Sequence, residues 1–254
     1  TDANRGAGSW DAMIAAMQRL KARGVPFGFS TRYHSGNVDR VASDAWVQEM
    51  VDRGCIFGWY FTYLPIGAGV APELMVSPAQ REHMYHRVRE LRRAKPIFLL
   101  DFWNDGEYVF GCIAGGRNYF HINARGDVEP CAFIHYSDTN IRTTSLLDAL
   151  RSPLFQQYRA HQPVNRNHLR PCPLLDNPGV LREMVHATGA VSTDARAPES
   201  VDTLTARTEA AARAWASTAD RLWQANPRRE SLEQREWPGK PHPERIAAAG
   251  VHQA

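Results

Sequence analysis

The chain has 254 residues, of which 43% are hydrophobic and 22% charged, an ordinary balance for a globular protein of one or two domains. Its formal net charge is only +3, and no stripe of basic residues is interleaved with aromatic ones, so no nucleic-acid partner is expected. No apolar run reaches the roughly 18 residues of a transmembrane helix, and the 4 cysteines are too few for a disulfide scaffold. These features predict a cytoplasmic protein without a membrane partner.

Helix-like and strand-like patterns alternate along the first part of the chain. Amphipathic segments that start at serine or proline predict helices, and short apolar segments predict strands. In chain order they are a helix that Ser9 caps and that runs to Arg23, a strand at Val25–Arg32, a helix from Ser43 to Gly54, a strand at Cys55–Tyr63, a helix from Pro78 to Arg93 and a strand at Pro96–Trp103. The strand Cys55–Tyr63 is almost entirely apolar, as expected for burial on both faces. The alternation predicts a parallel α/β sheet or barrel.

A cysteine-bearing hairpin follows this α/β region. Cys112 and Cys131 flank two strand-like runs, Tyr119–Asn123 and Asp127–Phe133, joined by a turn in which Gly126 can take a positive φ. Such a hairpin brings both cysteines to the same end. Cys172 lies between two prolines that stiffen the backbone. The sequence therefore predicts that three thiols gather into a metal or iron–sulfur site.

The chemistry of three thiolates leaves several ligand sets open. Thiolates suit iron–sulfur clusters or zinc, and a cluster usually takes four ligands. A non-cysteine group, Asp176, His135 or His168, can complete the site, or one iron can stay open for substrate. Three cysteines and a histidine also make a zinc set, and three unligated thiols are the remaining reading. Cys55 begins an apolar strand and is expected to be a buried small hydrophobe.

Helices are predicted again after the hairpin. They are short helices within Thr144–Ala160, then Val180–Thr188 and Val201–Gln224, whereas Asn226–Ala254 is charged, contains prolines and is expected to be partly disordered. In a β/α barrel each strand precedes its helix, yet the alternation here begins with a helix. We therefore predict an α/β fold: the C-terminal half of a partial β/α (TIM-like) barrel at 1–103, a small α+β cysteine-hairpin domain at 104–188 and a helical to disordered tail at 189–254. The chain is expected to be a fragment.

The cysteine spacing resembles a known family. Cys112-x13-Gly126-x4-Cys131 with a later cysteine is similar to the SPASM and shorter "twitch" domains at the C-terminus of radical S-adenosylmethionine enzymes. HINARGDVEPCAF at 121–133 resembles the hairpin of these domains, and residues 140–159 resemble the helical segment that follows it. Upstream, Asp2 to Gly6 resembles the D-x-x-R-G segment after the fourth barrel strand, and Tyr63 to Gly67 the Pro-x-Gly exit of the sixth strand.

The resemblance implies an activity and a set of cofactors. Enzymes of this kind cleave S-adenosylmethionine to a 5′-deoxyadenosyl radical at a [4Fe–4S] cluster held by C-x3-C-x2-C, a motif that this sequence lacks. This chain would supply an auxiliary [4Fe–4S] cluster on Cys112, Cys131 and Cys172, and would be inactive alone. The implied partners are a small-molecule or peptide substrate and an electron donor of the flavodoxin or ferredoxin type.

The wall that faces S-adenosylmethionine and substrate is expected at the carboxyl ends of the strands. The candidates are Arg5, Thr31, Thr62, Pro65 and Gly67. A competing hypothesis from another class is a non-catalytic zinc-binding α/β module with structural cysteines.

Overall fold

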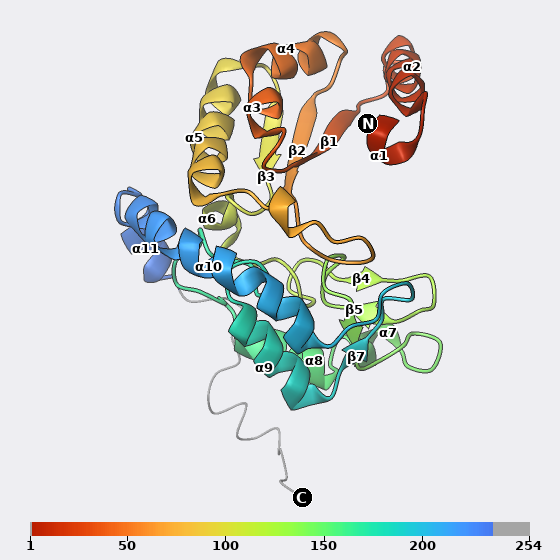
Figure 1. The fold of residues 1–254 in the computed structure, drawn as a ribbon, viewed down its shortest axis with the longest axis vertical. Coiled ribbons are helices and arrows are strands. Elements are labelled where there is room, and N and C mark those ends of the chain that lie inside the picture. The colour runs from red at the N-terminus through yellow and green to blue at the C-terminus, as the bar shows by residue number, and fades with distance from the viewer. Residues whose placement is uncertain (1, 236–254) are drawn as a thin grey trace, which may run out of the picture. The chain divides into compact units, whose positions relative to one another are not determined.

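The computed structural model describes residues 2–235, which form two compact units. The first unit comprises residues 2–63 and 74–102, and the second comprises residues 64–73 and 103–235 (Figure 1). No helix in this described part of the chain is long and apolar enough to cross a membrane.

A three-stranded parallel sheet forms the centre of the first unit. Its strands are β1 (Gly28–Tyr33), β2 (Phe57–Thr62) and β3 (Phe98–Asp101), in the order β1-β2-β3 (Figure 1). Gly28 lies opposite Phe57, and Phe57 lies opposite Phe98. The prediction of an α/β fold with a parallel sheet is thus confirmed, although each strand is shorter than the apolar run that predicted it.

Serine side chains cap two helices of the first unit by accepting hydrogen bonds from backbone amides that have no partner within the helix. The helices of this unit are α1 (Asp2–Arg5), α2 (Ser9–Ala22), α3 (Val38–Val41), α4 (Asp44–Asp52) and α5 (Pro78–Ala94), and a 3-10 turn spans Pro72–Leu74. Ser43 caps α4 as predicted, by accepting a hydrogen bond from the amide of Trp46. The predicted cap at Ser9 is wrong, because Gly8 occupies the cap position and the Asp2 carboxylate accepts from the Trp10 amide at 2.7 Å.

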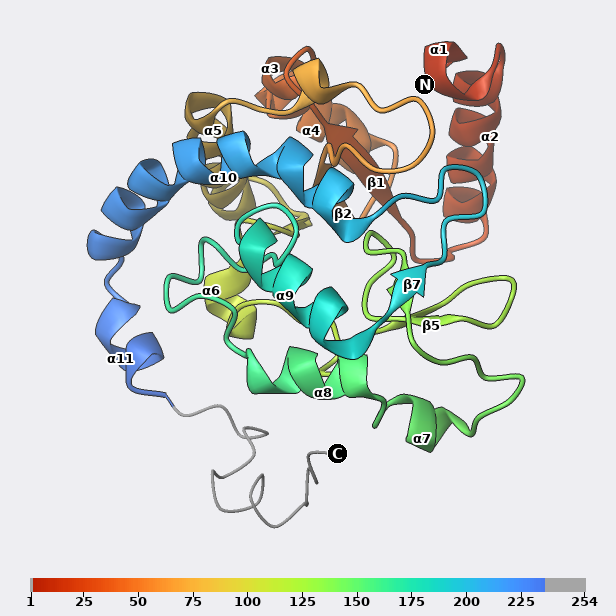
Figure 2. The same cartoon turned by 60° about the horizontal axis from the view of Figure 1, so that its bottom comes forward.

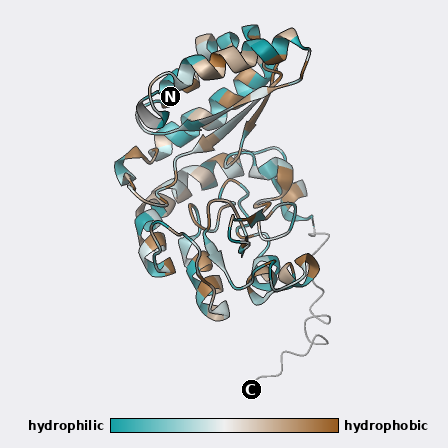
Figure 3. Ribbon diagram, turned by 90° about the vertical axis from the view of Figure 1, so that its right-hand side faces the viewer, coloured by the Kyte–Doolittle hydropathy of each residue, from teal (hydrophilic) through white to brown (hydrophobic). Residues whose placement is uncertain are grey.

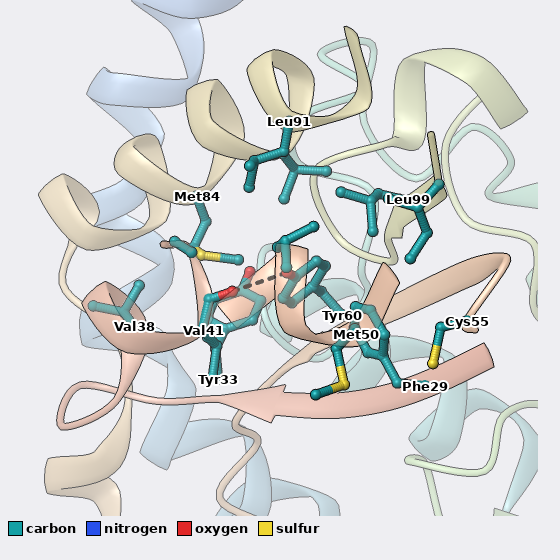
Figure 4. Close-up of a cluster of buried hydrophobic side chains, with 14 of the residues drawn as sticks. Phe29, Tyr33, Val38, Val41, Met50, Cys55, Tyr60, Met84, Leu91 and Leu99 are labelled. Carbon is teal, nitrogen blue, oxygen red and sulfur yellow. Dashed lines mark hydrogen bonds between the residues drawn. The ribbon is translucent and has the colours of Figure 1, made fainter. Parts of the chain in front are cut away.

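The core of this unit lies between the helices and one face of the sheet. Figure 4 shows side chains of the strands meeting those of α3, α4 and α5, among them Phe29, Tyr60, Leu99, Val41 and Met84. The hydroxyl of Tyr60 donates to the carbonyl of Val41 at 2.9 Å inside this core. Cys55 is also there and is 3% exposed, as expected for a small hydrophobe.

The opposite face of the sheet is open. Phe57, Trp59 and Phe98 are 39%, 37% and 59% exposed, so the prediction that β2 is buried on both faces is wrong. The apolar composition of this face comes from aromatic rings that contact one another: the ring centroids of Trp59 and Phe61 are 5.0 Å apart, and those of Phe61 and Phe102 are 5.3 Å apart. An apolar run therefore does not by itself establish burial on both sides.

The second unit combines two small antiparallel pairs of strands with helices. β4 (His121–Ile122) pairs with β5 (Val128–Glu129), and β6 (Tyr136–Ser137) pairs with β7 (Val191–Ser192). The helices are α6 (Gly106–Val109), α7 (Leu146–Ala149), α8 (Pro153–Ala160), α9 (Pro178–Thr188), α10 (Val201–Gln224) and α11 (Arg229–Glu233). The small β4–β5 pair is the predicted cysteine hairpin, with strands shorter than expected.

Helices α8, α9 and α10 pack in sequence, with α9 between the other two (Figure 2). Both hydrophobic and hydrophilic stretches appear along the helices in Figure 3, as expected for helices with one face on a core. The indole nitrogen of Trp215 in α10 donates to the carbonyl of Leu169 at 2.9 Å. Of the segment predicted to be partly disordered, α11 is ordered as a short helix, and residues 236–254 lie outside the described residues.

Candidate metal centre

A loop and the hairpin bring Cys112 and Cys131 together. Gly126 has a φ of 91° in the hairpin turn, as predicted, and its amide donates to the carbonyl of Asn123 at 2.9 Å. The amide of Gly115 donates to the carbonyl of Pro130 at 2.9 Å, which fixes the loop after Cys112 against the residue before Cys131. The Cys112 segment is thus hydrogen-bonded directly to the hairpin.

Arg117 holds the same loop from inside. Its guanidinium donates to the carbonyls of Phe110 and Cys112, each at 2.7 Å, and to that of Val109. Burial lowers the pKa of Arg117 to about 10, whereas the nearby Cys112 acts in the opposite direction and raises this pKa. The Arg117 cation therefore donates hydrogen bonds to three backbone carbonyls and lies near the thiol of Cys112.

Cys172 is positioned by the turn that leads into α9. Its amide donates to the Asp176 carboxylate at 3.0 Å, and its carbonyl accepts from the Asp176 amide at 3.0 Å. Its sulfur accepts from the amide of Leu175 at 3.3 Å. Asp176 is 1% exposed, so a buried carboxylate stands next to this cysteine.

The three thiols of Cys112, Cys131 and Cys172 share one buried environment. Burial raises the pKa of Cys112 to about 11. The pKa of Cys172 is raised to about 12, mainly by burial and then by the charges of Asp176 and Cys112. The pKa of Cys131 is also raised well above its usual value, by burial first and then by Cys112 and Cys172. The three sulfurs therefore lie within electrostatic range of one another.

The three cysteines form a donor set of the kind that soft metals prefer. Among residues 2–235, no group of three or more His, Cys, Asp or Glu side chains is arranged so that it could hold a metal ion as the chain stands. The hydroxyl of Tyr158 and the amide of Gln162 are buried in the same region without a well-formed hydrogen bond to a described residue. Soft thiolates beside unpaired hydrogen-bond donors suit a group that itself presents several sulfur atoms.

A comparison with protein families decides the assignment of this region. Residues 112–173 match the SPASM family, an iron–sulfur cluster-binding domain. Residues 112–173 thus have the sequence of a SPASM domain. Such domains are typical of the C-terminal auxiliary part of radical S-adenosylmethionine enzymes. Searches of curated proteins and of solved structures found no match to the chain.

The three candidates for a fourth ligand to the SPASM site differ in their surroundings. Asp176 acts electrostatically on both Cys112 and Cys172. His135 is hydrogen-bonded to Glu129, and this bond raises its pKa. Burial lowers the pKa of His168 to about 4, and the charges that act on it most are those of Arg117, Glu107 and Glu233. Asp176 is therefore the candidate whose charge lies next to the cysteines.

The five predicted wall residues do not fall within one unit. Arg5, Thr31 and Thr62 belong to the first unit, at the end of α1, on β1 and on β2, whereas Pro65 and Gly67 belong to the second. The carbonyl of Pro65 accepts from Arg207 at 2.8 Å, and Gly67 lines a small pocket with His135 and Asp194. Their role in binding S-adenosylmethionine or substrate stays a prediction.

Residues that the sequence did not single out surround the thiols and the hairpin. They are Arg117, Glu129, Tyr158 and Gln162. Glu129, next to the Pro-Cys pair, was visible in the sequence, but its bond to Thr193 spans 64 positions along the chain. The others carry no local pattern that distinguishes them from ordinary surface or core residues.

Glu129 is the centre of a buried hydrogen-bond network that holds the hairpin. It is 0% exposed and bonded to His121 at 2.7 Å, to Asn123 at 3.1 Å, to His135 at 3.4 Å and to Thr193. Burial opposes its ionisation, but the bonds from His135, Thr193 and His121 outweigh burial and lower its pKa to about 2. The carboxylate is therefore ionised at neutral pH and joins β5 to the segment around Thr193.

We predict that Glu129→Gln destabilises the chain in a pH-dependent way. Because the pKa falls from 4.5 to about 2 on folding, the carboxylate stabilises the folded state fully above pH 4.5 and progressively less as the pH falls toward 2. Loss of a charged partner to buried donors costs on the order of 1–3 kcal/mol near pH 7. Urea denaturation of both proteins at a series of pH values measures this difference.

The matched control for Glu129→Gln is Glu183→Gln, which removes the charge of an exposed glutamate in α9. It should leave the free energy of unfolding nearly unchanged at every pH. A gap between wild type and Glu129→Gln that stays constant from pH 7 to pH 3 would contradict the role given to the carboxylate.

Proposed function

We propose that this chain is the C-terminal part of a radical S-adenosylmethionine enzyme and that Cys112, Cys131 and Cys172 hold an auxiliary [4Fe–4S] cluster. The observation that carries the proposal is the shared buried environment of these three thiols within the segment that matches SPASM. Buried thiols with pKa values of about 11 and 12 stay protonated at neutral pH unless a metal displaces the protons. An iron–sulfur cluster would stabilise all three as thiolates.

A bound auxiliary cluster supplies electron transfer, or, where one iron lacks a protein ligand, a Lewis-acid position for a substrate heteroatom. The protein's own contribution is to fix the three cysteines before the cluster binds. The loop at Gly115, the hairpin turn at Gly126 and the Asp176 carboxylate each hold the backbone of one cysteine segment.

The parallel sheet β1-β2-β3, with helices packed on one face, is what the second half of a β/α barrel would contribute. In the full-length enzyme, S-adenosylmethionine and a second [4Fe–4S] cluster would bind to that barrel, and Arg5, Thr31, Thr62, Pro65 and Gly67 are the candidates for its wall. The proposed substrate is a small molecule or a peptide. The proposed reductant is a flavodoxin- or ferredoxin-type protein in the cytoplasm, a compartment in which the chain's free cysteines stay reduced.

Anaerobic reconstitution of the chain with iron and sulfide tests the cluster. The protein should turn brown and contain iron and sulfide in similar amounts. Cys131→Ser should abolish most of the visible absorbance, because it removes a ligand from the hairpin. Cys55→Ser is the matched control, since Cys55 lies in the core of the other unit, and it should retain the colour. A colourless protein with one equivalent of zinc would instead support the structural zinc module.

A second prediction concerns the fourth ligand, for which we propose Asp176. Asp176→Asn keeps an oxygen that can accept from the Cys172 amide but removes the carboxylate charge. The reconstituted variant should still hold a cluster, with a changed electron paramagnetic resonance signal in the reduced state and easier loss of one iron on oxidation. His135→Ala and His168→Ala are the comparisons. A signal that is unchanged in Asp176→Asn but altered in either histidine variant would transfer the assignment to that histidine.

A third prediction concerns the catalytic motif. Radical chemistry needs the C-x3-C-x2-C loop, so the reading frame that encodes this chain should continue upstream of Thr1 and encode that motif in the first third of the full-length protein. Determination of the upstream coding sequence measures this directly. A frame that opens at Thr1 would reject the enzyme proposal for this polypeptide while leaving cluster binding by the SPASM domain intact.

A further inference from the structure

Tyr158 in α8 carries a buried hydroxyl without a partner. Its side chain is 1% exposed, and its hydroxyl has no hydrogen-bond partner among residues 2–235. A buried hydroxyl left unpaired is energetically costly, and such groups are rare in folded proteins. The hydroxyl of Tyr158 therefore points to an acceptor that is not among these described residues.

The ring of Tyr158 lies directly beneath the loop that follows Cys112. Gly115 has a φ of 68°, and a Cβ atom built on it would come within 2.4 Å of the Tyr158 side chain. The same glycine donates its amide to the carbonyl of Pro130, the residue before Cys131. Only a glycine fits between the ring and the loop, so the chain places this tyrosine at the junction of the two cysteine segments.

The electrostatics agree with this placement. Burial raises the pKa of Tyr158 well above its usual value, and Cys112, Cys131 and Cys172 each raise it further. Tyr158 therefore lies within electrostatic range of all three sulfurs. A protonated phenol can act as a hydrogen-bond donor to a negatively charged group.

Gln162 supplies a second donor from the same part of the chain. It follows Tyr158 by four positions, is 3% exposed and has no well-formed hydrogen bond to a described residue from either its amide nitrogen or its amide oxygen. Its amide lies close enough to the Cys112 thiol to favour the thiolate. Two unpaired polar side chains at one buried place point to a single acceptor rather than to two separate packing faults.

We propose that Tyr158 and Gln162 donate hydrogen bonds to sulfur atoms of the iron–sulfur cluster and thereby raise its reduction potential. The inference rests on the proposed function, because it takes the cluster on Cys112, Cys131 and Cys172 as given. Reduction adds negative charge to the cluster, so a donor to its sulfurs stabilises the reduced state more than the oxidised state. The protein thereby sets how readily the cluster accepts an electron, without a further ligand.

The test uses Tyr158→Phe in the full chain, reconstituted with iron and sulfide. The variant removes only the hydroxyl and keeps the ring that packs against Gly115. Its iron and sulfide content should equal that of wild type, while its midpoint potential, measured by a redox titration of the visible absorbance, should be lower. We expect a shift equivalent to a tenfold change in the reduction equilibrium, or about 59 mV for a one-electron couple.

Tyr136→Phe is the matched control, because the hydroxyl of Tyr136 already donates to the carbonyl of Glu199 at 3.1 Å. It should leave the potential unchanged. Resonance Raman spectra in H2O and D2O give a second readout that is independent of the potential. Iron–sulfur stretching bands should shift on deuteration in wild type and in Tyr136→Phe, and should shift less in Tyr158→Phe.

The outcomes separate this inference from the proposed function. An intact cluster in Tyr158→Phe with an unchanged potential and an unchanged deuterium shift overturns the inference and leaves the cluster assignment in place. A cluster that forms in wild type and in Tyr136→Phe but not in Tyr158→Phe makes the phenol a requirement for assembly and also overturns it. A wild-type chain that takes up no iron and sulfide rejects the proposed function, and the inference with it.

Discussion

The site depends on the burial of three thiols in one shared space. A lone buried thiol is a harmless small hydrophobe, as Cys55 shows in the core of the first unit. Cys112, Cys131 and Cys172 differ because they act on one another: Cys112 and Cys172 raise the pKa of Cys131, and Cys112 raises that of Cys172. The carboxylate of Asp176 raises the pKa of Cys112 and of Cys172 as well. Negative groups gathered away from water need a strongly positive partner to be ionised together. Thiolates are soft ligands, and the positive partners they prefer are soft metal ions and the irons of iron–sulfur clusters.

The chain fixes the backbone around the thiols rather than the thiols themselves. Arg117 bonds the carbonyls before and at Cys112, Glu129 joins the hairpin to a distant segment, and Asp176 binds the amide of Cys172. Each of these charges is satisfied by backbone or by polar side chains. The sulfurs are thereby held in position while they remain available to a ligand, which is the preorganisation that a second layer of hydrogen bonds gives a metal site.

The sequence predicted what local rules control and missed what distant contacts control. Some features depend on only a few adjacent residues and could be predicted from the sequence. They are the spacing of Cys112 and Cys131, the positive φ of Gly126 and the cap at Ser43. The cap of α2 was wrongly assigned to Ser9 because the Asp2 carboxylate reaches it from eight positions upstream. Neither the open aromatic face of the sheet nor the bond between Glu129 and Thr193 has a local signature, since both arise from where separate segments pack.

The proposed position of Asp176 gives the cluster an asymmetry. Three of its ligands would be soft thiolates and the fourth a hard carboxylate oxygen, which binds iron less tightly than sulfur does. The same carboxylate already accepts a hydrogen bond from the amide of Cys172, so it can leave the metal without becoming an unpaired buried charge. Asp176 would then hold the iron at which a substrate heteroatom could bind, where the cluster would supply Lewis-acid chemistry. Tyr158 and Gln162 would remain donors to sulfur atoms of the same cluster.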